Sequence, residues 1–272
     1  MDQNSLKYFI NVVLVKTIYD SNIGATSRAM SNMAGHRLIL IDPQCEITLK
    51  GHQAAAGGQR ALENRVVYKS WSEFFENETS GIRISFTEKE KKNRLVQDFA
   101  SSLKIIRQQI HNQRALLTVE ENENVNEQSH SLLETTPLYL IFGPEDWGLS
   151  SEDIENTHYS CSIPIYGEHT SLNLAQAVLL ALFILRSEWG GDRTEFEGHT
   201  SSKFVRKENK PFPDEALKTW ITEMGFDIRD RKMNAYSVLK RMILHSIPNE
   251  KELRILDIVL HQGIRKLREY NE

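Results

Sequence analysis

Short runs of β-branched and other apolar residues recur along the N-terminal part of the chain, and amphipathic stretches separate them. Runs of this length are typical of buried strands, whereas apolar positions three and four residues apart are typical of helices. The runs that predict strands are 9–15, 37–42, 138–142 and 161–165, with weaker candidates at 66–68 and 82–86. Strands that alternate with helices predict an α/β fold with a parallel sheet.

Two of the intervening stretches have clear helical spacing. Residues 23–34 follow a polar turn in which Ser21 or Asn22 can cap the first amides of a helix. Residues 88–117 carry an apolar stripe at three- and four-residue steps, which consists of Leu95, Phe99, Leu103, Ile106 and Ile110. Such a stripe predicts a helix with one face towards the core.

A third helix is expected at 172–188, where the sequence is strongly apolar. Ser171 is its expected N-cap. Asn173 and Gln176 interrupt the apolar start about one turn apart, and as buried amides they would need hydrogen-bond partners in another loop or a ligand.

Two polar stretches divide the chain. Residues 118–136 contain five glutamates and no lysine or arginine, so we expect an acidic surface loop within a large domain of residues 1–188. Residues 189–213 are rich in glycine, serine and charge, and they predict a linker. Residues 214–272 predict a small domain of two or three helices, with apolar positions at Leu217, Trp220, Ile221, Met224, Leu253, Leu256, Val259, Leu260, Ile264 and Leu267.

The composition of the 272 residues, with 40% hydrophobic and 26% charged, is that of a globular protein. The longest apolar run, 174–185, is about half of the roughly 20 residues that a bilayer span needs, and the N-terminus has no signal-like pattern. We therefore expect a cytoplasmic protein with no membrane association. Cys45 and Cys161 lack metal-ligand spacing, so we expect buried free thiols and no metal site.

The net charge of -4 does not exclude an RNA partner, because the five glutamates of 118–136 account for it and the rest of the chain is close to neutral. Three basic groups are candidate phosphate contacts, although charged linkers and helix faces are more often simply solvated. They are Arg206, Lys207 and Lys210; Arg229, Arg231 and Lys232; and Lys240 and Arg241.

Three unusual segments follow the ends of predicted strands, where open α/β sheets build their ligand sites. In 21–30, Arg28 lies near a helix N-terminus that attracts anions, so it is either a phosphate or hydroxyl ligand or a surface arginine. In 143–149, two glycines flank Glu145, and the loop lacks the dinucleotide and Walker fingerprints. Trp147 in this loop is either an anchor or a stacking surface for a base. The third segment is 171–177.

Taken together, the three segments resemble the signature motifs of the SPOUT class of S-adenosylmethionine-dependent RNA methyltransferases, and specifically of its SpoU branch of ribose 2'-O-methyltransferases. Residues 22–29 resemble N-x-G-x-x-x-R-A, residues 143–149 resemble G-x-E-x-x-G-L, and residues 171–177 resemble S-L-N-x-A-x-A. The resemblance covers roughly residues 10–188. It implies a homodimer and a parallel sheet with helices on both faces and a deep C-terminal trefoil knot, which is rare among folds.

The resemblance also implies roles for individual residues. Arg28 would help to deprotonate or position the ribose hydroxyl, Asn22 and Glu145 would shape the site, and Ser171 and Asn173 would lie near the reacting groups. In the dimer, one chain's Arg28 would meet the other chain's cofactor. S-adenosylmethionine would be held largely by backbone groups at Leu140, Ile141, Phe142, Gly143, Gly148, Ile163, Ile165, Leu172 and Ala177.

The implied reaction is methyl transfer to a ribose 2'-hydroxyl of RNA. The helical segment after the knot is similar to that of family members that methylate position 32 in the tRNA anticodon loop, and residues 220–226 and 239–241 carry this similarity. An rRNA target, base methylation of tRNA and a non-catalytic knotted RNA-binding protein remain alternatives. The chain departs from the family in its long acidic stretch and in Thr26 and Ser27, which replace alanines and are expected to affect the fold little.

Overall fold

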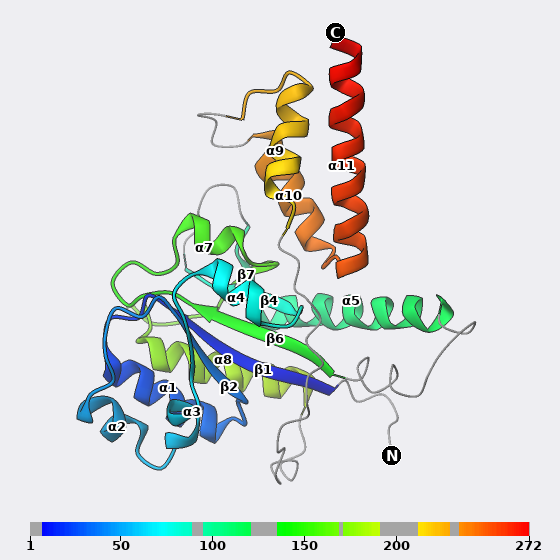
Figure 1. Ribbon diagram of the computed structural model, residues 1–272. Coiled ribbons are helices and arrows are strands. Elements are labelled where there is room, and N and C mark those ends of the chain that lie inside the picture. The colour runs from blue at the N-terminus through cyan, green and yellow to red at the C-terminus, as the bar shows by residue number, and fades with distance from the viewer. Residues whose placement is uncertain are drawn as a thin grey trace.

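The computed structural model describes residues 7–88, 95–120, 135–168, 171–190, 212–228 and 234–271. Its centre is a seven-stranded sheet in the order β3-β2-β1-β6-β4-β7-β5, and every strand pair is parallel. The strands are β1 (Lys7–Val15), β2 (Arg37–Ile41), β3 (Val66–Tyr68), β4 (Ile82–Phe86), β5 (Gln97–Asp98), β6 (Thr135–Phe142) and β7 (Tyr159–Ser162). The expected α/β fold with a parallel sheet is confirmed (Figure 1).

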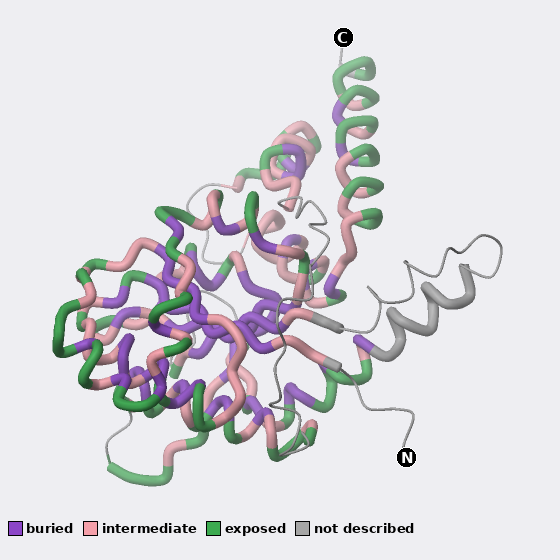
Figure 2. The backbone as a smooth tube through the Cα atoms, turned by 60° about the horizontal axis from the view of Figure 1, so that its bottom comes forward, coloured by how far each residue is buried: buried purple, intermediate pink, exposed green. Residues whose placement is uncertain are grey.

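Successive residues of a strand point to opposite faces of the sheet. Apolar residues therefore lie on both faces, and helices cover both. On β1, Val12 and Leu14 belong to one core and Val13 and Val15 to another. The first core is closed by α1 (Asp20–Asn32), α2 (Leu49–Ala55), α3 (Gln59–Glu63), α5 (Phe99–Glu120) and α8 (Leu174–Trp189). The second is closed by α4 (Trp71–Asn77) and α7 (Ser151–Glu155). Figure 2 shows the buried residues concentrated along the central strands.

Three further helices, α9 (Asp214–Glu223), α10 (Ala235–His245) and α11 (Glu250–Asn271), form a separate group above the sheet in Figure 1. They share a small apolar core that includes Leu217, Ile221 and Leu260. The end of α10 and the residues after it contact the part of the molecule that contains the sheet. The side chain of Gln109 on α5 donates a hydrogen bond to the carbonyl of His245 at 3.2 Å, and Ile247 enters the first core.

Several strand and helix boundaries differ from the sequence expectations, and strand pairing explains two of these differences. The helix expected at 88–117 begins only at Phe99, because Gln97 and Asp98 pair with β7. Leu95 precedes the helix with 69% of its surface exposed, so it is not part of the buried stripe. The strand expected at 161–165 instead spans Tyr159–Ser162, since its first residues pair with β4.

Other expectations about burial also need correction. Val259 is 59% exposed and does not face the small core. Cys161 is buried as expected, but Cys45 is only half-buried, and neither cysteine forms a disulfide. Most of the stretches 118–136 and 189–213 lies outside the described residues. Among the helices that are described, none is long and apolar enough to cross a membrane.

Candidate active site

The three motif segments meet at one edge of the sheet. Because β1 and β6 are parallel neighbours, the residues that follow them emerge at the same edge. Helix α8 also starts there, after the segment that follows β7. Residues far apart in the sequence are therefore placed side by side, as expected for an open parallel sheet.

A chain of hydrogen bonds joins all three motifs. The Asn22 Nδ2 atom donates to Glu145 Oε1 at 2.8 Å. The Asn173 Nδ2 atom donates to Asn22 Oδ1 at 2.9 Å. The amide of Asn22 thus bridges a carboxylate from the second motif and an amide from the third.

Glu145 also accepts hydrogen bonds from backbone N–H groups at the start of α1. The Ile18 N–H donates to Glu145 Oε2 at 3.0 Å, and the Tyr19 N–H donates to Glu145 Oε1 at 3.4 Å. The expected cap by Ser21 or Asn22 is wrong, because α1 begins at Asp20 and both residues lie inside the helix. A carboxylate from a distant loop supplies acceptors beside the helix start.

The expectation that Ser171 is the N-cap of α8 is also wrong. Its N-cap is Asn173, whose Oδ1 accepts a hydrogen bond from the Ala175 N–H at 3.0 Å, and not Ser171. Asn173 and Gln176 are exposed, which contradicts the expectation of two buried amides. Asn173 therefore has two uses, since its oxygen caps the helix and its nitrogen bonds to Asn22.

A cavity of about 390 Å³ opens beside this network. Its lining residues are Tyr19, Ser21, Asn22, Glu145, Ser171, Leu172, Asn173 and Leu174. Four of the five expected catalytic residues, Asn22, Glu145, Ser171 and Asn173, thus surround one space. Tyr19 also lines the cavity and was not among the expected site residues, because an isolated aromatic residue in a turn gives no signal of its own in the sequence.

The fifth expected catalytic residue, Arg28, is not among the residues that line the cavity. It is exposed on α1, nearly two turns beyond Asn22. Gly58 packs against it so closely that a Cβ atom on Gly58 would lie 2.6 Å from the Arg28 Cα. Within a single chain, the structure does not bring Arg28 to the cavity wall.

Ser27 holds this part of α1 in place. Its fully buried hydroxyl donates to the carbonyl of Gly58 and accepts a hydrogen bond from the Leu62 N–H at 2.9 Å. The serine that replaces an alanine of the family pattern therefore ties α1 to α3, which the sequence argument did not anticipate.

The expected cofactor residues fall into two groups. Leu140 and Ile141 are fully buried within β6, and each pairs with strands on both sides. The others lie at the strand ends or beyond: Phe142, Gly143, Gly148, Ile163, Ile165, Leu172 and Ala177. A Cβ atom on Gly143 would lie 2.2 Å from the Leu149 nitrogen, so the loop after β6 can close only around glycine.

Of the expected phosphate contacts Lys240 and Arg241, Lys240 is wrong, whereas Arg241 is half-buried and stays a prediction. Lys240 is 7% exposed, and its Nζ atom forms an ion pair with Asp214 Oδ1 at 2.9 Å. A buried and paired ammonium is unavailable to RNA. The expected contacts at 206–210 and 229–232 lie outside the described residues.

Comparison with known proteins identifies relatives over most of the chain. The sequence profile of the SpoU rRNA Methylase family matches residues 10–183. The tRNA (cytidine/uridine-2'-O-)-methyltransferase TrmJ of Yersinia enterocolitica is 24% identical over 255 residues, which covers 91% of this chain and 88% of the relative. The protein of that name from Escherichia coli K12 is 25% identical over 259 residues, with 92% and 93% covered.

Solved structures show the same fold. The crystal structure of TrmJ from Z. mobilis has a TM-score of 0.59 at 22% identity and covers 93% of this chain and 98% of that one. A methylase family protein from Haemophilus influenzae has a TM-score of 0.51 at 21% identity, with 96% and 98% covered. Since the family profile matches more than half of the chain and includes all three motif segments, the protein belongs to the SpoU methylase family.

Proposed function

We propose that this protein transfers a methyl group from S-adenosylmethionine to the 2'-hydroxyl of a ribose in tRNA. The observation that carries the proposal is that Asn22, Glu145, Ser171 and Asn173 line one cavity and that hydrogen bonds join their three separate motifs. The curated relatives are named as tRNA (cytidine/uridine-2'-O-)-methyltransferases over nearly their whole length. We further propose nucleotide 32 of the anticodon loop as the target and the cytoplasm as the site of action.

The residues at the sheet edge fit S-adenosylmethionine. The tight loop closed around Gly143 brings backbone groups close together, which suits a ligand held by main-chain hydrogen bonds. Ile163, Ile165 and Leu172 are half-buried and offer apolar surface to an adenine ring. When bound, the cofactor supplies an electrophilic methyl group.

The protein's own residues then have to position the ribose. An oxygen that attacks a methyl group must approach in line, so orientation supplies much of the rate. In this proposal the Ser171 hydroxyl hydrogen-bonds to the ribose, and the Glu145–Asn22–Asn173 network keeps the cavity wall rigid. Arg28 positions the hydroxyl or, with a helper such as the RNA phosphate, accepts its proton, since a guanidinium alone is a very poor base.

We propose that the active unit is a homodimer in which Arg28 reaches the partner's cavity. Two observations support this arrangement. Arg28 is exposed outside the cavity of its own chain. Helix α8 exposes large apolar side chains, with Leu180 at 37% and Phe183 at 54%, and such surface suits a subunit contact.

We also propose the family's trefoil knot and a division into residues 1–188, a linker at 189–213 and a helical domain at 214–272. Membership of the SpoU family supports the knot. The separate apolar core of α9, α10 and α11 supports the helical domain.

The test is to incubate the purified protein with labelled S-adenosylmethionine and unmodified total tRNA, and to identify the methylated nucleoside after digestion. We expect a 2'-O-methylated pyrimidine that is absent with Arg28→Ala. A methylated base would overturn the ribose assignment. Product from rRNA but not from tRNA would favour the rRNA alternative, which the description of the matched family as rRNA methylases keeps open.

A further inference from the structure

Tyr19 is the one aromatic residue among those that line the candidate active-site cavity. Half of its surface, 50%, is exposed. The ring therefore borders both the cavity and the solvent in front of it, where a bound RNA would lie.

Helix stability does not explain a tyrosine at this position. Tyr19 is the N-cap residue of α1, and its side chain makes no capping hydrogen bond. Serine, threonine, aspartate and asparagine are preferred at N-caps because they supply that bond. The Glu145 carboxylate binds the backbone N–H groups of Ile18 and Tyr19 beside the helix start, and the Tyr19 side chain takes no part in capping, so it is available for another role.

The backbone of Tyr19 is fixed on both sides. Its N–H donates to Glu145, and its carbonyl accepts hydrogen bonds from the N–H groups of Asn22 at 3.0 Å and Ile23 at 3.4 Å. A tyrosine has only two side-chain torsions, so a ring on such a backbone loses little conformational entropy on binding.

Two further aromatic side chains are exposed in loops that end at the same edge of the sheet. Trp147, in the loop after β6, is 66% exposed, and Tyr166, in the segment after β7, is 95% exposed. The segments that follow β1, β6 and β7 thus each present an exposed aromatic ring: Tyr19, Trp147 and Tyr166. Single-stranded RNA is recognised in large part by stacking of unpaired bases on aromatic side chains.

We propose that Tyr19 stacks on the unpaired pyrimidine base of the target nucleotide, whose own ribose enters the cavity. This inference rests on the proposed function and adds the element that holds the base. A stacked ring contacts the face of the base and not its hydrogen-bonding edge. Tyr19 therefore binds cytidine and uridine alike and contributes affinity without discriminating between them.

The test compares steady-state methylation by Tyr19→Ala, Tyr19→Leu, Tyr19→Phe and Tyr19→Trp on tRNA transcripts that carry either cytidine or uridine at the target position. Alanine and leucine are expected to raise the KM for tRNA roughly tenfold to a hundredfold, as for loss of one stacked base. We expect the same factor for both transcripts and an unchanged KM for S-adenosylmethionine. Phenylalanine and tryptophan keep the ring and are expected to stay within about threefold of the wild-type protein.

Tyr270→Ala is the matched control, because Tyr270 is 89% exposed near the end of α11, far along the chain from the motifs. Three results would overturn the proposal: an unchanged KM in Tyr19→Leu, a Tyr19→Phe variant as weak as Tyr19→Leu, or a factor that differs between the two transcripts. Failure of the proposed function is distinct, since the wild-type protein itself would then form no 2'-O-methylated nucleoside.

Discussion

At the scale of single residues, the Glu145 carboxylate links the start of α1 to the candidate site. Its two oxygens accept hydrogen bonds from the Ile18 and Tyr19 N–H groups and from the Asn22 amide. In Glu145→Gln one acceptor oxygen becomes a donor, so we expect a loss of about 1–3 kcal/mol of stability. We also expect kcat/KM for methylation to fall roughly tenfold or more as the cavity wall loosens.

Thermal unfolding and methylation kinetics measure the two effects of Glu145→Gln. Glu152→Gln is the matched control, because Glu152 is an exposed carboxylate in the next helix, α7. Wild-type kinetics in Glu145→Gln would show that the network does not organise the site.

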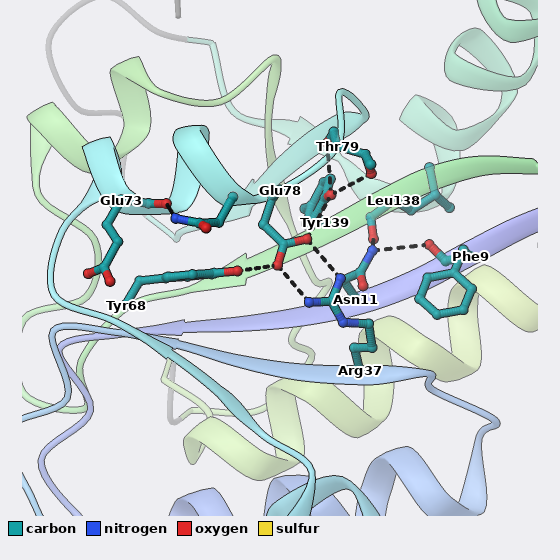
Figure 3. A network of polar contacts seen from close by, with 10 residues as sticks. Phe9, Asn11, Arg37, Tyr68, Glu73, Glu78, Thr79, Leu138 and Tyr139 are labelled. Carbon is teal, nitrogen blue, oxygen red and sulfur yellow. Dashed lines mark hydrogen bonds and ion pairs between the residues drawn. The ribbon is translucent and has the colours of Figure 1, made fainter. Parts of the chain in front are cut away.

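A second residue-scale prediction concerns the ion pair of the buried Glu78 with Arg37, whose side chain is 34% exposed, at the amino ends of the strands, opposite the candidate site. Figure 3 shows the Glu78 carboxylate held by the Arg37 guanidinium and by the hydroxyl of Tyr68, with contacts of 2.6 Å from each. The Glu78 side chain is 2% exposed. Arg37→Met leaves the buried Glu78 carboxylate without its counter-charge, and because Arg37 is partly exposed we expect a loss of stability at or below the about 3–5 kcal/mol of a fully buried pair.

Chemical denaturation of Arg37→Met measures that loss of stability. Arg254→Met is the control, since the exposed pair of Arg254 and Glu250 is expected to contribute less than about 1 kcal/mol. Equal stability of the two variants would contradict the assignment of Glu78 as a buried charge.

The third residue-scale prediction concerns pH. Hydrogen bonds from Thr48, first that of its side-chain hydroxyl, lower the pKa of Asp20, and the N–H of Gly51 adds to them. A lowered pKa in the folded state adds stability above the unfolded value of about 3.9, and this stability is lost as the pH falls through the folded value. The Tm of the wild-type protein is therefore expected to fall more steeply below pH 4 than that of Asp20→Asn. Parallel curves of Tm against pH for the two proteins would show that Asp20 does not cause the loss of stability.

At the scale of elements, the close approach of α1 and α2 fixes the helix that carries Asn22 and Arg28. A Cβ atom on Gly24 would lie 1.9 Å from the carbonyl oxygen of Gly51, a rigid backbone atom. Gly24→Ala must therefore push the two helices apart, and such overpacking costs about 1–3 kcal/mol. Gly167→Ala is the control because a Cβ atom there meets nothing within 4 Å. Equal unfolding midpoints for the two variants would show that the helices are not locked together.

The elements themselves followed from local pattern, but their ends did not. The strand runs at 66–68 and 82–86 match β3 and β4, because the first is rich in β-branched residues and the second alternates apolar residues with Arg83 and Ser85. Helix starts depend on partners elsewhere in the chain, such as Glu145 for α1, and spacing alone does not reveal them. The two residues of β5 are too short to give a pattern, and pairing with β7 moved the start of α5 to Phe99.

At the scale of the whole molecule, the three sequence motifs correctly predict four residues of the cavity wall. They were found because each motif has polar residues in a fixed order, and the parallel sheet then brought them to one edge. Tyr19 was missed because its role depends on where the fold leaves its ring exposed. The position of Arg28 away from the cavity also required the three-dimensional arrangement.

That position of Arg28 gives the last prediction, which concerns the assembly of two chains. If each active site combines one chain's Arg28 with the partner's cavity, then Arg28→Ala and Asn173→Ala damage different halves of the same site. After unfolding together and refolding, half of the dimers are mixed, and each mixed dimer contains one intact site. The mixture is therefore expected to recover about one quarter of wild-type activity, although each variant alone is inactive. Arg28→Ala mixed with Arg28→Lys is the control, because neither chain supplies the arginine. An arginine that acts within its own chain would give no recovery, since every mixed dimer would then contain two damaged sites.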